Sequence, residues 1–198
     1  MHLAFYIFQG IGIACAIGIR PFLPGLAVGA LALGDVEIHF DHSKYSFLQG
    51  APFLIVLGVL AVVLLVQEQS PWAGRIQGRQ PGAIALGLIS LMVGAVFFAG
   101  ALCGRGYIAW PGLLGGALCA FVGYIAARLF LTRLRARLDD DAAAVGVPLV
   151  ANGSALLIAV LSVVAPPVGV IALLGVLWLI YRGRGRDEQK YAGLRILR

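Results

Sequence analysis

The sequence predicts an all-α fold, a polytopic bundle of membrane helices with six or seven membrane segments. The 198 residues are 61% hydrophobic and only 12% charged, whereas soluble domains are about one quarter charged. The mean hydropathy is +0.95. Long stretches contain no Lys, Arg, Asp or Glu, and the longest of them is 142–181. We therefore expect a single integral membrane domain over residues 1–198 and no soluble domain of ordinary size.

Each expected segment is an apolar stretch near the length that crosses a hydrocarbon core of about 30 Å, at about 1.5 Å per residue of helix. The segments are 3–19, 21–34, 51–66, 82–102, 109–131, 145–165 and 167–181. The last two form one long apolar block that is interrupted at Pro166 and Pro167. Because proline breaks a helix, this block predicts a tight helical hairpin. Residues 182–198 form a basic tail.

The distribution of basic residues predicts the orientation, because Lys and Arg are enriched in cytoplasmic loops. Arg75 and Arg79 lie in one loop, four arginines lie within 128–137, and six basic residues lie within 182–198. These regions hold twelve of the fifteen Lys and Arg residues, and they alternate with the expected spans so that they share one side. We expect a bacterial inner-membrane protein with a cytoplasmic C-terminus.

The first 34 residues allow two arrangements. As helix they would measure about 51 Å, short of the roughly 60 Å that two full crossings require. In the first arrangement, 1–19 and 21–34 form a hairpin with Arg20 and Pro21 at its cytoplasmic turn, and the N-terminus is outside. In the second, 21–34 is a broken or re-entrant half-helix, six spans remain, and the N-terminus is inside. Pro21 and Pro24 suit the first turn of a new helix in both.

Arg20 is the main candidate functional residue. An arginine inside a membrane is costly unless it is paired, so a buried Arg20 would mark a functional site. We expect Arg20, with Pro21 and Pro24, to line a solute site or pore together with Asn152 and Ser154 of "LVANGSAL". The alternative is an Arg20 at the membrane surface, with Asn152 and Ser154 in interhelical hydrogen bonds.

The loop "DVEIHFDHSKYSF" at 35–47 alternates polar and apolar residues, which is the period of an extended segment along the outer interface. One face carries Asp35, Glu37, His39 and Asp41, and the other carries Val36, Ile38 and Phe40. The polar face has donors that suit a divalent metal ion. Open loops often carry such charges without ligand-fixing partners, so we predict no metal site and no cofactor.

The sequence contains no catalytic constellation. No Ser/His/Asp set, HExxH motif, pair of intramembrane aspartates or phosphate-binding glycine loop is evident. Cys15, Cys103 and Cys119 form no CxxC pair, so neither a disulfide framework nor a zinc site is indicated. We predict that the protein is not an enzyme.

The expected partners are membrane lipids and an unknown small solute or ion, and not nucleic acid. The basic residues lie beside span ends, where the orientation rule and anionic lipid headgroups account for them. Glycines spaced by four, such as Gly112 and Gly116, let helices approach closely, either within one chain or between two copies in a homo-oligomer.

Several stretches resemble an uncharacterised family of bacterial polytopic membrane proteins, a domain-of-unknown-function class. They are "GIRPFLPGLAVGAL", "FDHSKYSFL", "AWPGLLGGALCA", "ANGSALLIAVLSVVAPP" and "KYAGLRILR", which together span nearly the whole chain. The resemblance implies a small all-helical inner-membrane protein and supplies no substrate, cofactor or catalytic residue. His42 and Lys44 stand where similar sequences prefer small polar residues, so it does not support a shared site in the loop.

The expected function is that of a small transporter or channel of unknown substrate, because broken helices and intramembrane polar groups are typical of transport sites and pores. The alternative is a structural or assembly factor of the cell envelope or lipid bilayer. Glycine-mediated packing and the small number of polar residues fit that alternative equally well.

Overall fold

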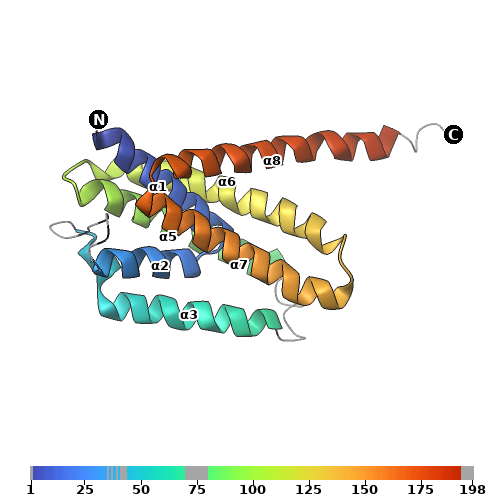
Figure 1. Cartoon of the computed structure of the whole chain (residues 1–198), viewed down its shortest axis with the longest axis horizontal. Helices are drawn as coiled ribbons and strands as arrows, with labels where there is room; N and C mark the ends of the chain where they lie inside the picture. The colour runs from blue at the N-terminus through green and yellow to red at the C-terminus, as the bar shows by residue number, and fades with distance from the viewer. Residues whose placement is uncertain are drawn as a thin grey trace.

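The computed structural model describes residues 2–34, 36, 38, 40, 44–69 and 80–192, and over these ranges the chain is all-α, with no strand. Its elements are α1 (His2–Ile19), α2 (Leu23–Leu33), the 3-10 helix η1 (Ser46–Gln49), α3 (Ala51–Gln69), α5 (Gln80–Cys103), α6 (Ala109–Arg135), α7 (Asp140–Val164) and α8 (Pro167–Ala192). The elongated bundle that they form confirms the predicted helical architecture (Figure 1).

Helix length and surface composition indicate a membrane protein. Three helices are long and apolar enough to cross a membrane, over Ile84–Cys103, Ala109–Arg135 and Val145–Val164, and the other four α-helices contain shorter apolar stretches. Large apolar side chains are exposed along the outward faces, for example Met92 at 70% and Leu118 at 67%. Apolar surface on this scale is unfavourable in water and suits contact with lipid.

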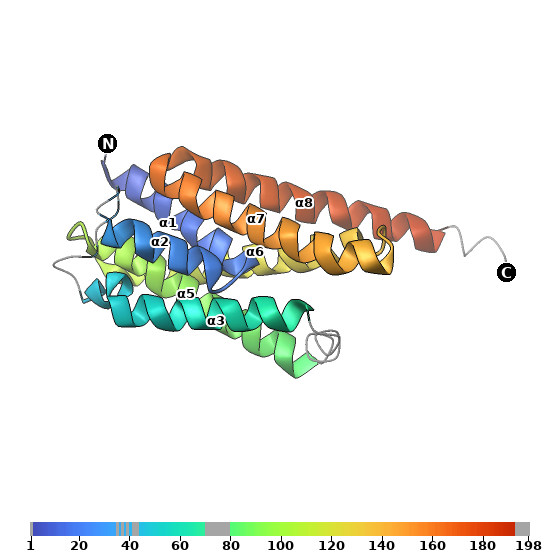
Figure 2. The same cartoon turned by 60° about the horizontal axis from the view of Figure 1, so that its bottom comes forward.

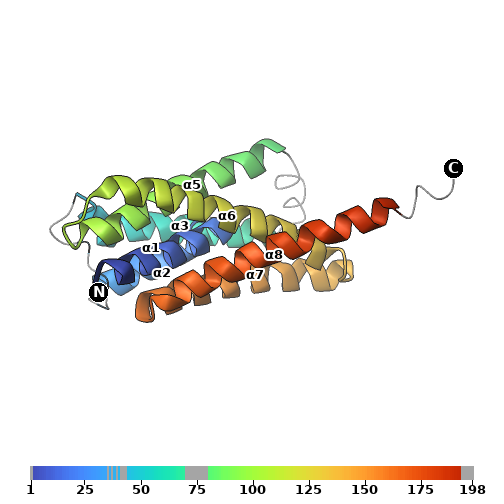
Figure 3. The same ribbon diagram turned by 90° about the horizontal axis from the view of Figure 1, so that it is seen from above.

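The first helix, α1, lies at the centre of the bundle. Every side chain from Ile13 to Ile17 is fully buried. The helix packs against α5, α6, α7 and α8, and Figure 3 shows it between the α5–α6 pair and the α7–α8 pair. In the sequence, α1 is one apolar segment among several. In the structure, it forms the core of the fold.

Glycines allow the neighbouring helices to approach α1 closely. A Cβ on Gly12 would come within 2.6 Å of the Cα of Gly169 in α8, and a Cβ on Gly18 would overlap the carbonyl oxygen of Ala120 in α6. A Cβ on Gly116 would likewise come within 2.7 Å of the Cα of Ala95 in α5. Small residues at these positions pack helices within the chain.

The bundle has two distinct ends. The start of α1, the end of α2, η1, the α5–α6 turn and the α7–α8 turn lie together at what we call the N-terminal end (Figures 1 and 2). The ends of α3, α6 and α8 and the start of α5 lie at the opposite, C-terminal end. The turn between α1 and α2 stops part-way along the bundle, short of the C-terminal end (Figure 2).

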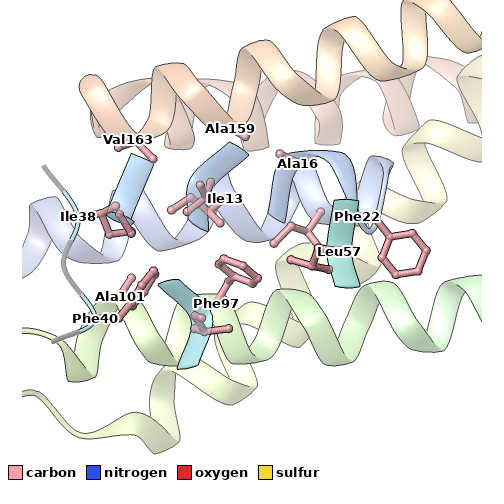
Figure 4. Packing of buried hydrophobic residues seen from close by; sticks show 14 of the residues in the cluster. Ile13, Ala16, Phe22, Ile38, Phe40, Leu57, Phe97, Ala101, Ala159 and Val163 are labelled. Atoms are coloured by element: carbon pink, nitrogen blue, oxygen red, sulfur yellow. The ribbon is translucent and has the colours of Figure 1, made fainter. Parts of the chain in front are cut away.

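The described part of the 35–47 loop covers the N-terminal end. Ile38 and Phe40 are buried, as the apolar face of the alternating pattern predicts, whereas Val36 is exposed. The backbone N–H of Phe40 donates to Oε1 of Gln49 at 3.1 Å. Figure 4 shows Phe40 beside Phe97 of α5, and the two rings meet edge-on with centroids 6.2 Å apart. The loop is thereby attached to the core.

Several helices extend beyond the expected segments, α8 by the most, and one short helix was not expected. The hairpin of α7 and α8 turns at Ala165 and Pro166, as predicted. However, α8 continues to Ala192, well beyond the predicted span end at residue 181, so the first part of the basic tail is helical. The short helix η1 was not expected, since the alternating pattern predicts an extended segment there.

Candidate functional site

The break between α1 and α2 follows from two prolines. Pro21 has no backbone N–H and disfavours a helical conformation in the residue before it, so α1 ends at Ile19. The N–H of Arg20 still donates to the carbonyl of Ala16, at 3.1 Å, and completes the last turn. Pro24 lies in the first turn of α2, where a missing N–H costs nothing. The chain therefore reverses at Arg20.

Helix contacts give the depth of Arg20 relative to α7. A Cβ on Gly12 of α1 would overlap the hydroxyl of Ser162 in α7, so these residues lie level. The two helices run antiparallel (Figure 1). Arg20 lies eight residues after Gly12, and Ser154 lies eight residues before Ser162, a rise of about 12 Å in each helix. Arg20 and Ser154 are therefore at about the same depth.

Aromatic and basic residues on α6 mark the edges of the apolar zone. Trp110, in the first turn, is 65% exposed. Near the other end of the helix, Nη1 of Arg128 donates to the hydroxyl of Tyr124 at 3.3 Å. Trp110 and Arg128 are 18 residues apart, about 27 Å of helix, which is close to the hydrocarbon thickness of a bilayer. Tryptophan, tyrosine and arginine are typical of the membrane interface.

A similar pair occurs on α8. The guanidinium of Arg182 lies over the ring of Trp178, 5.0 Å from its centroid. Val176 and Ile180 of α8 belong to the same buried cluster as Ala126 of α6. Arg182 and Arg128 each come shortly after these contacting residues in the sequence, so the two arginines lie at a similar depth. Both mark the C-terminal edge of the apolar zone.

Arg20 lies inside this zone. Two contacts relate α1 to α6: a Cβ on Gly18 would overlap the carbonyl of Ala120, and one on Gly123 would overlap the carbonyl of Cys15. Because the two helices run in the same direction, these contacts together place Arg20 level with about residue 125, some three residues or about 5 Å of helix before Arg128. The Arg20 side chain is nevertheless half-buried rather than fully buried. The backbone of a charged residue therefore lies within the apolar zone, and its side chain is partly accessible.

The other predicted site residues have different surroundings. Pro21 and Pro24 are buried, so they shape the turn. Asn152 and Ser154 are half-buried at the depth of Arg20. Because residues two apart on a helix point about 200° apart, at most one of these two side chains faces Arg20. The hydroxyl of Ser154 donates to the carbonyl of Ala151 in its own helix, at 3.2 Å.

Buried polar side chains within the described ranges are bonded to backbone carbonyls. They are Gln9, Ser90 and Ser162. The two serines donate to carbonyls one turn earlier in their own helices, at 2.9 and 2.6 Å. Gln9 instead joins two helices, since its Nε2 donates to the carbonyl of Val163 at 3.2 Å. These groups stabilise the fold and do not belong to the Arg20 site.

The polar face of the 35–47 loop lies outside the described residues, namely Asp35, Glu37, His39 and Asp41. In the part of the chain that the structure describes, no group of three or more His, Cys, Asp or Glu side chains is arranged to hold a metal ion. The three cysteines there are free thiols.

The exposed apolar helices and the small-residue packing define the class of a helical membrane protein. The family follows from comparison with known families, because the model of a domain of unknown function (DUF4126) matches residues 7–185. The chain belongs to this family, and the predicted resemblance to an uncharacterised family is thereby confirmed. No curated protein and no solved structure matches the chain.

Proposed function

We propose that this protein is a small transporter or channel that moves a solute or ion across a bacterial inner membrane. The observation that carries the proposal is the partly accessible Arg20 at the apex of a helical hairpin inside the apolar zone. A charge at such depth is unfavourable unless it is paired or faces a water-filled cavity. Helices that break inside the membrane are typical of the sites at which transporters bind their substrates.

The proposed topology has five crossings, formed by α3, α5, α6, α7 and α8, and one re-entrant hairpin formed by α1 and α2. Arg128, Arg133, Arg135 and Arg182 lie toward the C-terminal end, and Lys44 and Arg105 lie toward the N-terminal end. The positive-inside rule then assigns the C-terminal end to the cytoplasm. The N-terminus is outside, as in the first sequence-based arrangement, but the turn does not reach the cytoplasmic surface.

The path is closed on the outer side by aromatic packing. Phe97 of α5 is fully buried and contacts Phe40 of the loop. It also lies near Phe53 of α3, with ring centroids 6.3 Å apart, and within 3.3 Å of the Cβ position of Gly25 in α2. If a path exists, we propose that it reaches Arg20 from the cytoplasmic side and that transport requires these aromatic contacts to open.

A flux assay tests the proposal. Purified protein in liposomes is given a panel of ions and small metabolites, and the wild type is compared with Arg20→Ala and Arg135→Ala. Arg135 is an exposed arginine in the last turn of α6 and serves as the matched control. We expect flux in the wild type and in the control and its loss in Arg20→Ala, with all three eluting as one species in detergent. Equal flux in Arg20→Ala, or no flux from wild type across the panel, would refute the proposal.

A structural or assembly role is the second candidate. It is favoured by the hydrogen bonding of Gln9, Ser90 and Ser162, whose polar groups are used within the fold and not along a path. It predicts a stable protein or lipid partner that co-purifies after mild detergent extraction, and no flux. A single unaccompanied species in every detergent would count against it.

A further inference from the structure

We propose that Arg128 of α6 holds the phosphate of an anionic phospholipid at the C-terminal edge of the apolar zone. The lipid lies against the outward side of α5 and α6. Three features support this binding: the way in which Tyr124 positions the guanidinium, the depth of Arg128, and the exposed apolar side chains beside it. Lipid binding here does not depend on the proposed transport function.

Tyr124 fixes the position of the Arg128 guanidinium. Nη1 of Arg128 donates to the tyrosine hydroxyl at 3.3 Å, and the Cζ of Arg128 lies 5.7 Å from the centroid of the same ring. The ring in turn packs against α5, where Gly87 leaves room for it: a Cβ on Gly87 would lie 3.0 Å from the Cζ of Tyr124. An arginine that is held in place before binding loses less side-chain freedom when it takes up a ligand.

The guanidinium is accessible to an anion. The Arg128 side chain is exposed, and among the described residues its polar and aromatic contacts are with Tyr124. A guanidinium has several N–H donors in a planar fork that matches the oxygens of a phosphate. Neither α5 nor α6 contains an Asp or Glu. The two helices therefore supply a cation for the headgroup and no carboxylate that would repel it.

The depth of Arg128 suits a lipid phosphate. Arg128 lies about 27 Å of helix from Trp110, so it stands at the edge of the hydrocarbon core, where the headgroups begin. Arg135 lies seven residues further along α6, about 10 Å beyond that edge. Both arginines are exposed, but only Arg128 has the depth at which one lipid can reach it with its phosphate and the apolar surface with its chains.

The outward side of α5 and α6 suits the acyl chains. Because α1 packs against both helices, their opposite side faces away from the core (Figure 3). Both helices carry exposed apolar side chains in this half of the bundle, namely Ile84 and Leu88 on α5 and Leu118 and Phe121 on α6. Phe121 precedes Arg128 by seven residues, nearly two whole turns, so the two lie on the same face of α6. A lipid whose phosphate meets Arg128 can therefore lay an acyl chain along Phe121.

The test measures lipid binding to the purified protein by native mass spectrometry, with phosphatidylglycerol and phosphatidylcholine of identical acyl chains as probes. We expect the wild type to bind phosphatidylglycerol more tightly than phosphatidylcholine by about fivefold or more. Arg128→Gln should abolish this preference. Tyr124→Phe, which keeps the ring and removes the hydroxyl, should reduce it. Arg135→Gln removes an exposed charge from the last turn of the same helix and is the matched control, which should behave as the wild type.

Four outcomes would overturn the proposal. Equal affinity of the wild type for the two lipids would show that no anionic headgroup is selected. Equal losses in Arg128→Gln and Arg135→Gln would mean that the preference reflects the general positive charge of this end. Displacement of phosphatidylglycerol by an excess of inorganic phosphate would indicate a site for a soluble anion instead of a lipid. If Arg128→Gln does not fold, an unchanged preference in Tyr124→Phe would show that the held guanidinium does not bind the headgroup.

Discussion

Gln9 of α1 donates a hydrogen bond from Nε2 to the carbonyl oxygen of Val163 in α7, at 3.2 Å, and both side chains are buried. The helical partners of this carbonyl would be the N–H groups of residues 166 and 167, which are both prolines and have none. Gln9 thus supplies the donor that the Pro166–Pro167 turn removes. The same bond holds the α1–α7 register that determines the depth of Arg20.

Replacing Gln9 should destabilise the protein. Gln9→Met keeps the volume of the side chain but leaves the Val163 carbonyl without its donor, and we expect a loss of about 1 kcal/mol in the free energy of unfolding. Thermal unfolding in detergent measures it. Ser90→Ala is the control, because the Leu86 carbonyl keeps its helical backbone partner when the serine hydroxyl is removed. Equal losses in the two variants would mean that the Gln9 bond does not stabilise the α7–α8 turn.

Adding a methyl group at Gly12 should separate α1 from α8. The new Cβ would come within 2.6 Å of the Cα of Gly169 and would overlap the side chain of Ser162. We expect Gly12→Ala to lower the free energy of unfolding by about 1 to 3 kcal/mol, as overpacked cores do. Gly175→Ala, in the lipid-facing part of α8, meets nothing within 4 Å and should be neutral or slightly stabilising. If both variants unfold at the wild-type temperature, α1 and α8 are not in close contact.

Truncating Phe97 should destabilise the outer half of the bundle. Its ring is fully buried between α2, α3, α5 and the loop, and Phe97→Ala should cost about 3 to 5 kcal/mol. Phe121→Ala removes an outward ring of α6 that is 46% exposed, and it should cost much less. Under the proposed function, Phe97→Leu, which preserves more of the core, should also raise the flux. A flux lower than that of the wild type would contradict the assignment of this cluster to the closed end.

The two chain ends should be accessible from opposite sides of the membrane. A tag at the N-terminus and the variant Ser46→Cys should react from outside intact cells, whereas Arg135→Cys should react only after permeabilisation. The physical reason is the odd number of crossings, with α1 and α2 returning to the side from which they start. An N-terminus on the same side as Arg135 would instead favour six spans with an inside N-terminus.

Water should reach the apex of the α1–α2 hairpin from the cytoplasmic side. In a background without the three native cysteines, Arg20→Cys should react with a charged thiol reagent that is added to inverted vesicles. Ile13→Cys, on the fully buried face of α1, should remain unreactive and is the control. An unreactive residue 20 in a folded protein would mean that lipid or protein fills the space beneath the hairpin.

The sequence by itself determined the class of fold and most helix positions. Uncharged stretches with the length of a bilayer, and a double proline that interrupts the last of them, depend only on composition and local backbone chemistry. Arg20 was also identified from the sequence, because a charge in an apolar region is conspicuous. The tertiary structure decided how deep Arg20 lies and which segment is central, because the distances between helices depend on contacts such as Gly12 with Gly169. Local helix geometry already turns Asn152 and Ser154 to different sides of α7, but packing decides that both lie at the depth of Arg20 and which side faces it. Depth and rotation arise from packing between segments far apart in the chain, and no local pattern specifies them.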